Sequence, residues 1–178
     1  MATRGRSQTA KTAIPCIYLF QDEEDAGFND EFHSWDTIHF KTQHFHYVAG
    51  ETRVYLDRGE GYYEIIFQCS YNLDRAESNR VFDHIYLNGS AIDGAKCITT
   101  YGKVWSQDAQ GYNWIDGNNN IHIIQYLKPG DYIQVYANTT YSTDRQADTC
   151  RLIIKFIPME GWNNSSGGRV EYKGGVSR

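Results

Sequence analysis

The chain twice places a glycine turn directly before a strand in which tyrosine and aliphatic residues alternate with other side chains. The two segments read GEGYYEIIFQCSYN, residues 59–72, and LKPGDYIQVYANTT, residues 127–140. Alternation with a period of two buries one face of a strand, and aromatic and β-branched residues suit a pleated, half-buried surface. Two such strands, each entered through a tight turn, indicate an all-β sandwich.

The bulk composition fits one globular domain and excludes several functions. The chain has 178 residues, 40% of them hydrophobic and 15% aromatic, and its formal net charge is −5. This charge predicts no direct contact with nucleic acid, which calls for a basic surface. No apolar run is long enough to cross a membrane, and residues 1–13 lack the apolar segment of a signal peptide. We therefore expect a protein that is made in the cytoplasm and does not enter a membrane.

Ten segments have the composition and alternation of strands, and turn residues separate most of them. The predicted strands cover residues 14–20, 37–40, 45–49, 53–56, 62–71, 81–87, 95–104, 121–127, 132–138 and 150–157. The predicted turns are Asn88-Gly89, Asp93-Gly94, Asp116-Gly117 and Pro129-Gly130. Residues 72–80 are predicted to form a long loop, and no segment has the period and caps of a helix.

The chain divides into an N-terminal arm (residues 1–13), a sandwich domain (14–160) and a glycine-rich C-terminal tail (161–178). The arm is basic, with Arg4, Arg6 and Lys11 and no acid, and an acid-rich loop follows the first strand at residues 21–31. The tail is too poor in apolar residues to form a core of its own. We expect both ends to act as anchoring arms that grip a neighbouring molecule.

The strand 132–138 separates its side chains into two sets by parity. The core set consists of Ile133, Val135 and Ala137. The opposite set is amphipathic, as subunit interfaces often are, and consists of Tyr132, Gln134, Tyr136 and Asn138. We predict that this second set contacts a neighbouring subunit. An ordinary solvated tyrosine face is the alternative.

The four cysteines show no C-x-x-C spacing, so a zinc or redox motif is not indicated. Cys69 and Cys150 alternate with apolar residues, which predicts two small buried thiols. Two disulfides would be the alternative in a secreted domain.

Two further segments contain possible metal ligands, but neither one indicates a metal site. His44 and His46 share one side of a strand, near His39, but no further ligand is placed beside them, so surface histidines are predicted. The run DGNNN, residues 116–120, lacks the ligand spacing of a calcium loop and is predicted to be a hairpin turn. No nucleophile elbow, phosphate loop or metalloprotease motif is present. We expect no catalytic residue, cofactor or metal.

Three segments together resemble the globular heads of complement-type and tumour-necrosis-factor-like proteins. GEGYYEIIFQCSYN resembles their strand with the pattern Gly-x-Tyr-Tyr, and VFDHIYLNGSAI, residues 81–92, resembles their next strand with its Asn-Gly turn. IHIIQYLKPGDYIQVYANTT, residues 121–140, resembles their later strand pair around Leu-x-x-Gly-Asp. The closing strand 149–159 lacks the Phe-Gly pair usual in these proteins, and the chain has no collagen-like stalk.

The resemblance implies an antiparallel jelly-roll β-sandwich and a homotrimer. With a basic arm and no stalk, the expected role is non-enzymatic: a decoration, cement or minor capsid protein of a virion, assembled in the host cytoplasm. Its expected partners are its own copies and other virion proteins such as a major capsid protein. The alternative is a receptor- or carbohydrate-binding head, either a fibre tip or a soluble trimeric ligand. An esterase- or glycosidase-type enzyme is disfavoured.

Overall fold

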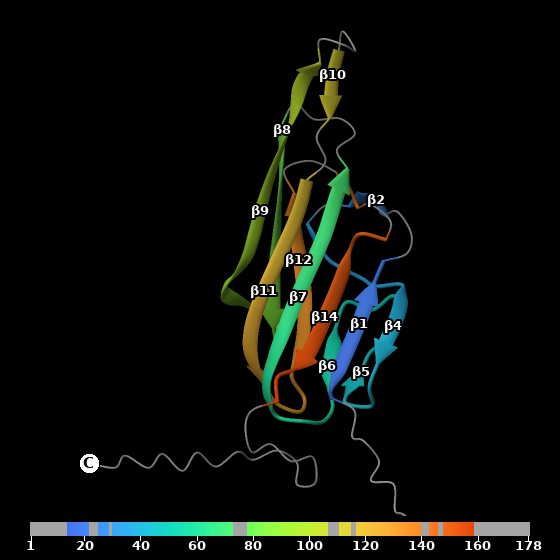
Figure 1. Ribbon diagram of the computed structural model, residues 1–178, viewed down its shortest axis with the longest axis vertical. Helices are drawn as coiled ribbons and strands as arrows, with labels where there is room; N and C mark the ends of the chain where they lie inside the picture. Colours follow the sequence, from blue (N-terminus) through green and yellow to red (C-terminus); the bar gives the residue numbers. More distant parts are fainter. Residues whose placement is uncertain are drawn as a thin grey trace, which may run out of the picture.

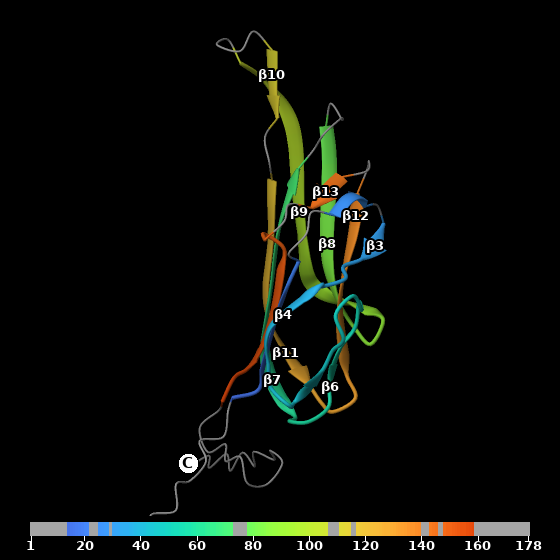
Figure 2. The ribbon, with the colours of Figure 1, turned by 90° about the vertical axis from the view of Figure 1, so that its right-hand side faces the viewer.

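The computed structural model describes residues 14–21, 25–28, 30–72, 78–106, 111–114, 117–139, 143–145 and 148–158. These residues form two antiparallel sheets that pack face to face, as Figure 2 shows, so the predicted all-β sandwich is confirmed. No helix that is long and apolar enough to cross a membrane occurs in this described part of the chain. The basic arm and the glycine-rich tail lie outside the described residues.

The first sheet, sheet 1, faces the viewer in Figure 1. Along its main path the strand order is β2-β13-β7-β14-β1-β4, and β11 pairs with β7 as well. The bounds are β1 Cys16–Phe20, β2 Asp25–Phe28, β4 Thr37–Lys41, β7 Gly61–Asn72, β11 Gly117–Leu127, β13 Thr143–Arg145 and β14 Arg151–Phe156.

The second sheet, sheet 2, has the order β10-β9-β8-β12-β6-β5, and the short β3 also pairs with β12. The bounds are β3 Glu31–Phe32, β5 Phe45–His46, β6 Val54–Leu56, β8 Ser78–Leu87, β9 Ser90–Ser106, β10 Gly111–Trp114 and β12 Tyr132–Thr139. The far end of β9 pairs with β10, and this hairpin extends beyond the sandwich at the top of Figure 1.

Each of the ten predicted strands has a counterpart in the structure. The four short strands β2, β3, β10 and β13 were missed, because two to four residues carry too little alternation to be recognised. The predicted core set of residues 132–138 is confirmed, since Ile133, Val135 and Ala137 of β12 are buried. Tyr63 and Tyr71 of β7 are likewise 0% exposed. The core lies between the sheets and is rich in aliphatic and aromatic side chains.

The turn that leads into β7 depends on close contacts that only glycine permits. The Tyr63 hydroxyl donates a hydrogen bond of 2.7 Å to the carbonyl oxygen of Gly59 in the turn. Gly59 and Gly61 have positive φ angles of 87° and 154°. A β-carbon on Gly61 would lie 2.6 Å from Cε2 of the Phe156 ring. Because these two glycines have no side chain, the turn can pack against the Tyr63 hydroxyl at Gly59 and against the Phe156 ring at Gly61.

Replacing Gly61 with alanine is expected to destabilise the fold more than the same change at Gly94. Both glycines have positive φ, which costs an alanine about 1–2 kcal/mol. Nothing lies within 4 Å of a β-carbon at Gly94, whereas the Phe156 ring must move at Gly61, which adds about 1–3 kcal/mol. Urea unfolding of both variants measures the difference, and equal losses would contradict the role given to Phe156.

Two of the predicted turns are as expected. Asn88 and Gly89 have φ angles of 53° and 80°, as in the two-residue turn that joins paired strands, here β8 and β9. At Pro129-Gly130 the backbone N–H of Asp131 donates to the carbonyl of Lys128, and Gly130 has φ 92°. This is a turn with proline and glycine at its two central positions.

Two other turn predictions were wrong. Asp93-Gly94 lies inside β9, where the register with β8 shifts, so the positive φ of Gly94 accompanies a bulge rather than a turn. In DGNNN, residues 117–120 belong to β11 and pair with residues 68–71 of β7, while residue 116 lies outside the described part. Residues 78–80 of the predicted loop are likewise the start of β8. At Asp93-Gly94 and in DGNNN, strand pairing outweighs the local turn preference of Asp, Asn and Gly.

Candidate functional site

The residues predicted to contact a neighbour all lie on the outward face of β12, but other parts of the chain partly cover them. The Arg53 guanidinium lies 4.9 Å above the Tyr132 ring, and the Tyr55 ring centroid lies 5.4 Å from that of Tyr132. Gln134 is only 4% exposed, because its amide donates a 3.0 Å hydrogen bond to the Thr52 hydroxyl. Gln134 therefore has almost no surface with which to contact a neighbour.

Tyr136 and Asn138 lie further along β12 and remain half-buried. The Tyr136 ring packs edge-on against Phe32 of β3 at 5.1 Å and against Tyr86 of β8 at 5.9 Å. The Asn138 side-chain amide donates a hydrogen bond to the Asp30 carboxylate. Contact of this face with a second subunit stays a prediction, and the residues that remain available for it are Tyr132, Tyr136 and Asn138.

The outward face of sheet 1 carries a row of apolar side chains that crosses four neighbouring strands. Phe40 of β4 pairs with Tyr18 of β1, Tyr18 with Ile153 of β14, and Ile153 with Ile66 of β7. Strand pairing therefore aligns the side chains of Ile66, Ile153 and Tyr18. Phe40 follows on β4, where the register with β1 shifts and the His39 ring packs on Tyr18 at 5.0 Å. The Phe40 side chain itself is 51% exposed.

More apolar surface continues from this row onto β11. Ile124 is 63% exposed, and the Tyr62 and Tyr126 rings meet edge-on at 5.2 Å and are each 44% exposed. Clusters of exposed large apolar residues on one face of a sheet often mark interaction surfaces. We call this surface, from Phe40 to Tyr126, the sheet-1 face.

Charges of both signs lie among the apolar residues of the sheet-1 face. Glu64 pairs in register with Lys155, and the His122 ring nitrogen Nε2 lies 2.8 Å from Oε1 of Glu64. Arg151 bonds through Nε to the side-chain oxygen of Gln68. A surface on which opposite charges are already paired locally presents no single-sign field to a partner.

A cluster of buried polar side chains lies between the sheets, with Asp83 of β8 at its centre. Asp83 is 0% exposed and receives hydrogen bonds from three side chains. The His33 nitrogen Nε2 lies 3.0 Å from Oδ1, the Tyr71 hydroxyl lies within 2.7 Å of both oxygens, and the Asn119 amide donates to Oδ2 at 2.6 Å. These donors replace the water that the carboxylate loses on burial.

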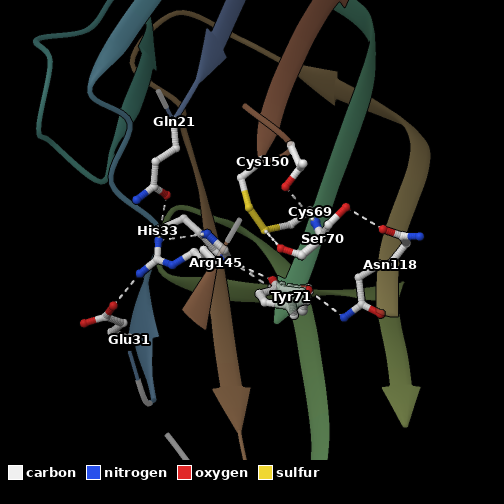
Figure 3. The surroundings of a disulfide bond; sticks show 12 residues. Gln21, Glu31, His33, Cys69, Ser70, Tyr71, Asn118, Arg145 and Cys150 are labelled. Carbon is white, nitrogen blue, oxygen red and sulfur yellow. Dashed lines mark hydrogen bonds and ion pairs between the residues drawn. A yellow bond between two sulfur atoms is a disulfide. The ribbon is translucent and has the colours of Figure 1, made fainter. Parts of the chain in front are cut away.

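Arg145 of β13 continues this buried cluster on the other side of His33, as Figure 3 shows. Its Nη1 lies 3.1 Å from His33 Nδ1 and 3.4 Å from the Gln21 side-chain oxygen, and its Nη2 forms an ion pair with Glu31. A guanidinium only donates, so Nδ1 of His33 must accept and the ring proton must lie on Nε2, facing Asp83. His33 is thus a neutral link between a buried cation and a buried anion.

Sequence patterns did not reveal this buried cluster. His33 and Arg145 lie in segments that were not predicted as strands, and Asn119 lies in the predicted hairpin turn. Parity within the predicted strands does place Asp83 inward with Val81 and Ile85. The inward parity of Ile121 likewise reaches Asn119 once β11 is extended to Gly117.

Cys69 and Cys150 are joined by a disulfide, so the prediction of two separate thiols was wrong, although both side chains are buried as expected. The bond links β7 to the residue just before β14 and closes a sequence separation of 81 residues (Figure 3). Cys16 and Cys97 are free thiols, and partial burial raises the pKa of Cys16.

The three clustered histidines make separate contacts. His39 packs against Tyr18 at 5.0 Å, His44 bonds to the Thr42 hydroxyl at 3.2 Å, and His46 lies near Tyr55. Partial burial, together with the nearby Arg58 charge, lowers the pKa of His44. Among the described residues no group of three His, Cys, Asp or Glu side chains is arranged to hold a metal ion.

A hollow of about 360 Å³ opens on the outward face of sheet 2. It is lined by six side chains from β8, β9 and β12: Phe82, His84, Tyr86, Lys96, Tyr136 and Asn138. A second, more polar hollow of about 410 Å³ lies on sheet 1 beside the disulfide and includes Gln68, Asn118 and Arg151. The first hollow contains two of the four residues predicted for the β12 interface.

The anchoring residues Arg4, Arg6 and Lys11 fall outside the described part of the chain. Two acids of the loop at residues 21–31 bind within the domain, Glu31 to Arg145 and Asp30 to Asn138. No protein-family model and no curated protein matches this sequence.

Proposed function

We propose that this chain is a non-enzymatic structural protein that assembles as a homotrimer through the sheet-1 face. The observation that carries the proposal is the row of Phe40, Tyr18, Ile153 and Ile66, extended by the exposed Ile124. Stable subunit interfaces have an apolar core within a polar rim. Glu64, Lys155 and His122 offset one another's charges, so this part of the sheet-1 face presents little net charge to a neighbouring subunit.

The strand order supports a jelly roll of the kind implied by the resemblance to complement and tumour-necrosis-factor heads. Four adjacent strands can be followed in each sheet, β1-β14-β7-β11 and β6-β12-β8-β9, and the first and last of these strands along the chain, β1 and β14, are adjacent. Two four-stranded antiparallel sheets connected in this way are typical of a jelly roll. The three resembling segments supply β7, the β8–β9 turn, and β11 with β12.

We further propose that the trimer serves on a virion as a decoration, cement or minor capsid component and binds other structural proteins such as the major capsid protein. The basic arm offers a charged attachment through Arg4, Arg6 and Lys11. The Cys69–Cys150 disulfide suits a protein that ends outside the cell, where thiols are not kept reduced.

Ile124→Glu is expected to convert the trimer to monomers. The exposed Ile124 side chain adds little to the fold of the single chain, whereas a carboxylate buried without a partner between subunits costs about 3–5 kcal/mol. Sedimentation velocity measures the change, starting from three times the 20.5 kDa mass of one chain.

Ile98→Glu is the matched control, because Ile98 is 52% exposed on the outward face of sheet 2. It is expected to leave the trimer intact. A monomeric wild-type chain, or a trimer broken by Ile98→Glu and not by Ile124→Glu, would contradict assembly through the sheet-1 face. The second result would favour the β12 face instead.

Attachment to the virion is tested separately by removing residues 1–13. The shortened protein is expected to trimerise normally but to decorate particles poorly in a co-assembly experiment with the other capsid proteins. Full occupancy without the arm would refute the anchoring role.

A further inference from the structure

We infer that the hollow on the outward face of sheet 2 is a binding site for an acidic sugar residue, a pyranose that carries a carboxylate. The site is lined by Phe82, His84, Tyr86, Lys96, Tyr136 and Asn138. It lies on the opposite side of the sandwich from the sheet-1 face, so it rests on the proposed assembly through that face, which leaves it open. The sequence left a carbohydrate-binding head as an alternative role, but its patterns did not place a binding site on the fold.

Sheet pairing places the lining residues beside one another on three strands. His84 of β8 pairs with Tyr136 of β12 on one side and with Lys96 of β9 on the other. Phe82 pairs with Asn138 in the next row that faces the same way. An aromatic ring, a cation and a side-chain amide therefore meet on one rigid surface. The volume of about 360 Å³ is at the small end of ligand pockets and suits one or two sugar rings.

Contacts within the protein hold the aromatic wall of the hollow in place before any ligand binds. The rings of Phe32, Tyr86 and Tyr136 pack edge-on against one another, with centroids 5.1–5.9 Å apart. The His84 nitrogen Nε2 lies 3.2 Å from the carbonyl oxygen of Ile92, so it donates there and the ring orientation is fixed. Binding to such a preorganised wall costs little side-chain entropy.

The chemistry of the lining matches the two sides of a sugar. A pyranose ring presents C–H bonds on its face, which pack on aromatic rings, and hydroxyl groups around its edge. Asn138 donates its amide hydrogen to Asp30, so its carbonyl oxygen is directed to accept from a hydroxyl. Tyr136 and Tyr86 offer both a ring and a phenolic hydroxyl, a combination common in recognition sites.

Lys96 selects an acidic sugar over a neutral one. Its ammonium lies 4.8 Å from the centroid of the Phe82 ring, at the rim of the hollow. An exposed cation–π contact of this kind is weak, so the ammonium can turn to a ligand carboxylate and form a stronger, charge-assisted bond. Lys96 is the one lysine or arginine among the six lining residues, and the carboxylate of Asp30 is already bonded to the Asn138 amide.

Isothermal titration of the full-length protein with 3′-sialyllactose and with a hyaluronan tetrasaccharide tests the proposal, and lactose serves as the neutral comparison. We expect binding of at least one acidic probe and at least about tenfold weaker binding of lactose, the difference made by one charged hydrogen bond. Lys96→Gln is expected to remove that preference. Lys128→Gln changes an exposed lysine outside the hollow and is expected to leave it intact.

Tyr136→Ala tests the aromatic wall and is expected to weaken the binding of every probe by tenfold or more. Tyr136→Phe keeps the ring and is expected to retain most of the affinity. Three outcomes would overturn the proposal: no binding of either acidic probe at millimolar concentration, equal binding of lactose, or binding that is insensitive to both Lys96→Gln and Tyr136→Ala. The sedimentation experiment with Ile124→Glu and Ile98→Glu tests the assembly separately, so failure of the sugar site and failure of the sheet-1 interface can be told apart.

Discussion

Asp83→Ala is expected to lower the free energy of unfolding by about 3–5 kcal/mol, because each hydrogen bond lost to a buried charged group costs about 1.5–3 kcal/mol. The change takes away the acceptor for His33, Tyr71 and Asn119, all of which are buried. His33 would also lose the group that orients its ring toward Arg145. Denaturant unfolding followed by tryptophan fluorescence measures the loss.

Asp93→Ala is the matched control for Asp83→Ala, because Asp93 is exposed on β9. Its expected effect is within about 0.5 kcal/mol of zero. A loss at Asp83 no larger than at Asp93 would show that the buried cluster does not stabilise the sandwich.

The contributions of Asp83 and Arg145 should also depend on each other. Arg145→Met alone removes the donor that fixes His33 on the side away from Asp83, whereas the double variant Asp83→Ala with Arg145→Met removes the groups on both sides of His33. We expect the double variant to lose clearly less stability than the sum of the two single losses, by at least about 1 kcal/mol. Additive losses would contradict the coupling through His33.

Reduction of the Cys69–Cys150 disulfide is the other change with a large expected effect. The bond closes a sequence separation of 81 residues and so restricts the unfolded chain strongly. Loss of a native disulfide costs about 2–5 kcal/mol, and the chain-entropy estimate for a loop of this length lies near the upper end. We expect wild-type protein to unfold at a lower temperature in dithiothreitol than in oxidising buffer.

Two variants test whether the stability lost in dithiothreitol comes from the Cys69–Cys150 disulfide. The double variant Cys69→Ala with Cys150→Ala is expected to be as unstable as reduced wild-type protein and to show no response to dithiothreitol. Cys16→Ala removes a free thiol and should keep the full response. A double variant that still responds, or a wild-type protein that does not, would contradict the pairing.

The candidate surfaces were predictable from sequence only in part. Parity along residues 132–138 placed Tyr136 and Asn138 outward on β12, and both line the hollow on sheet 2. Phe82 and Lys96 come from other strands, and nothing local to either residue indicates that β8 and β9 bring them to the same place. The sheet-1 face was missed for the same reason, since Phe40 and Ile66 become neighbours only through β1 and β14.

The sequence by itself determined the strands and the direction of their side chains. A period of two and the glycine turns before Tyr63 and Tyr132 are local properties, so the sandwich, much of its core and the Asn88-Gly89 turn follow from them. The tertiary structure alone decided which distant groups meet: Cys69 with Cys150, and Asp83 with His33 and Arg145. Periodicity reports which face a residue occupies, but a buried charge or thiol is defined by its partner across the sheets. That partner is set by strand order and register, which no single strand encodes.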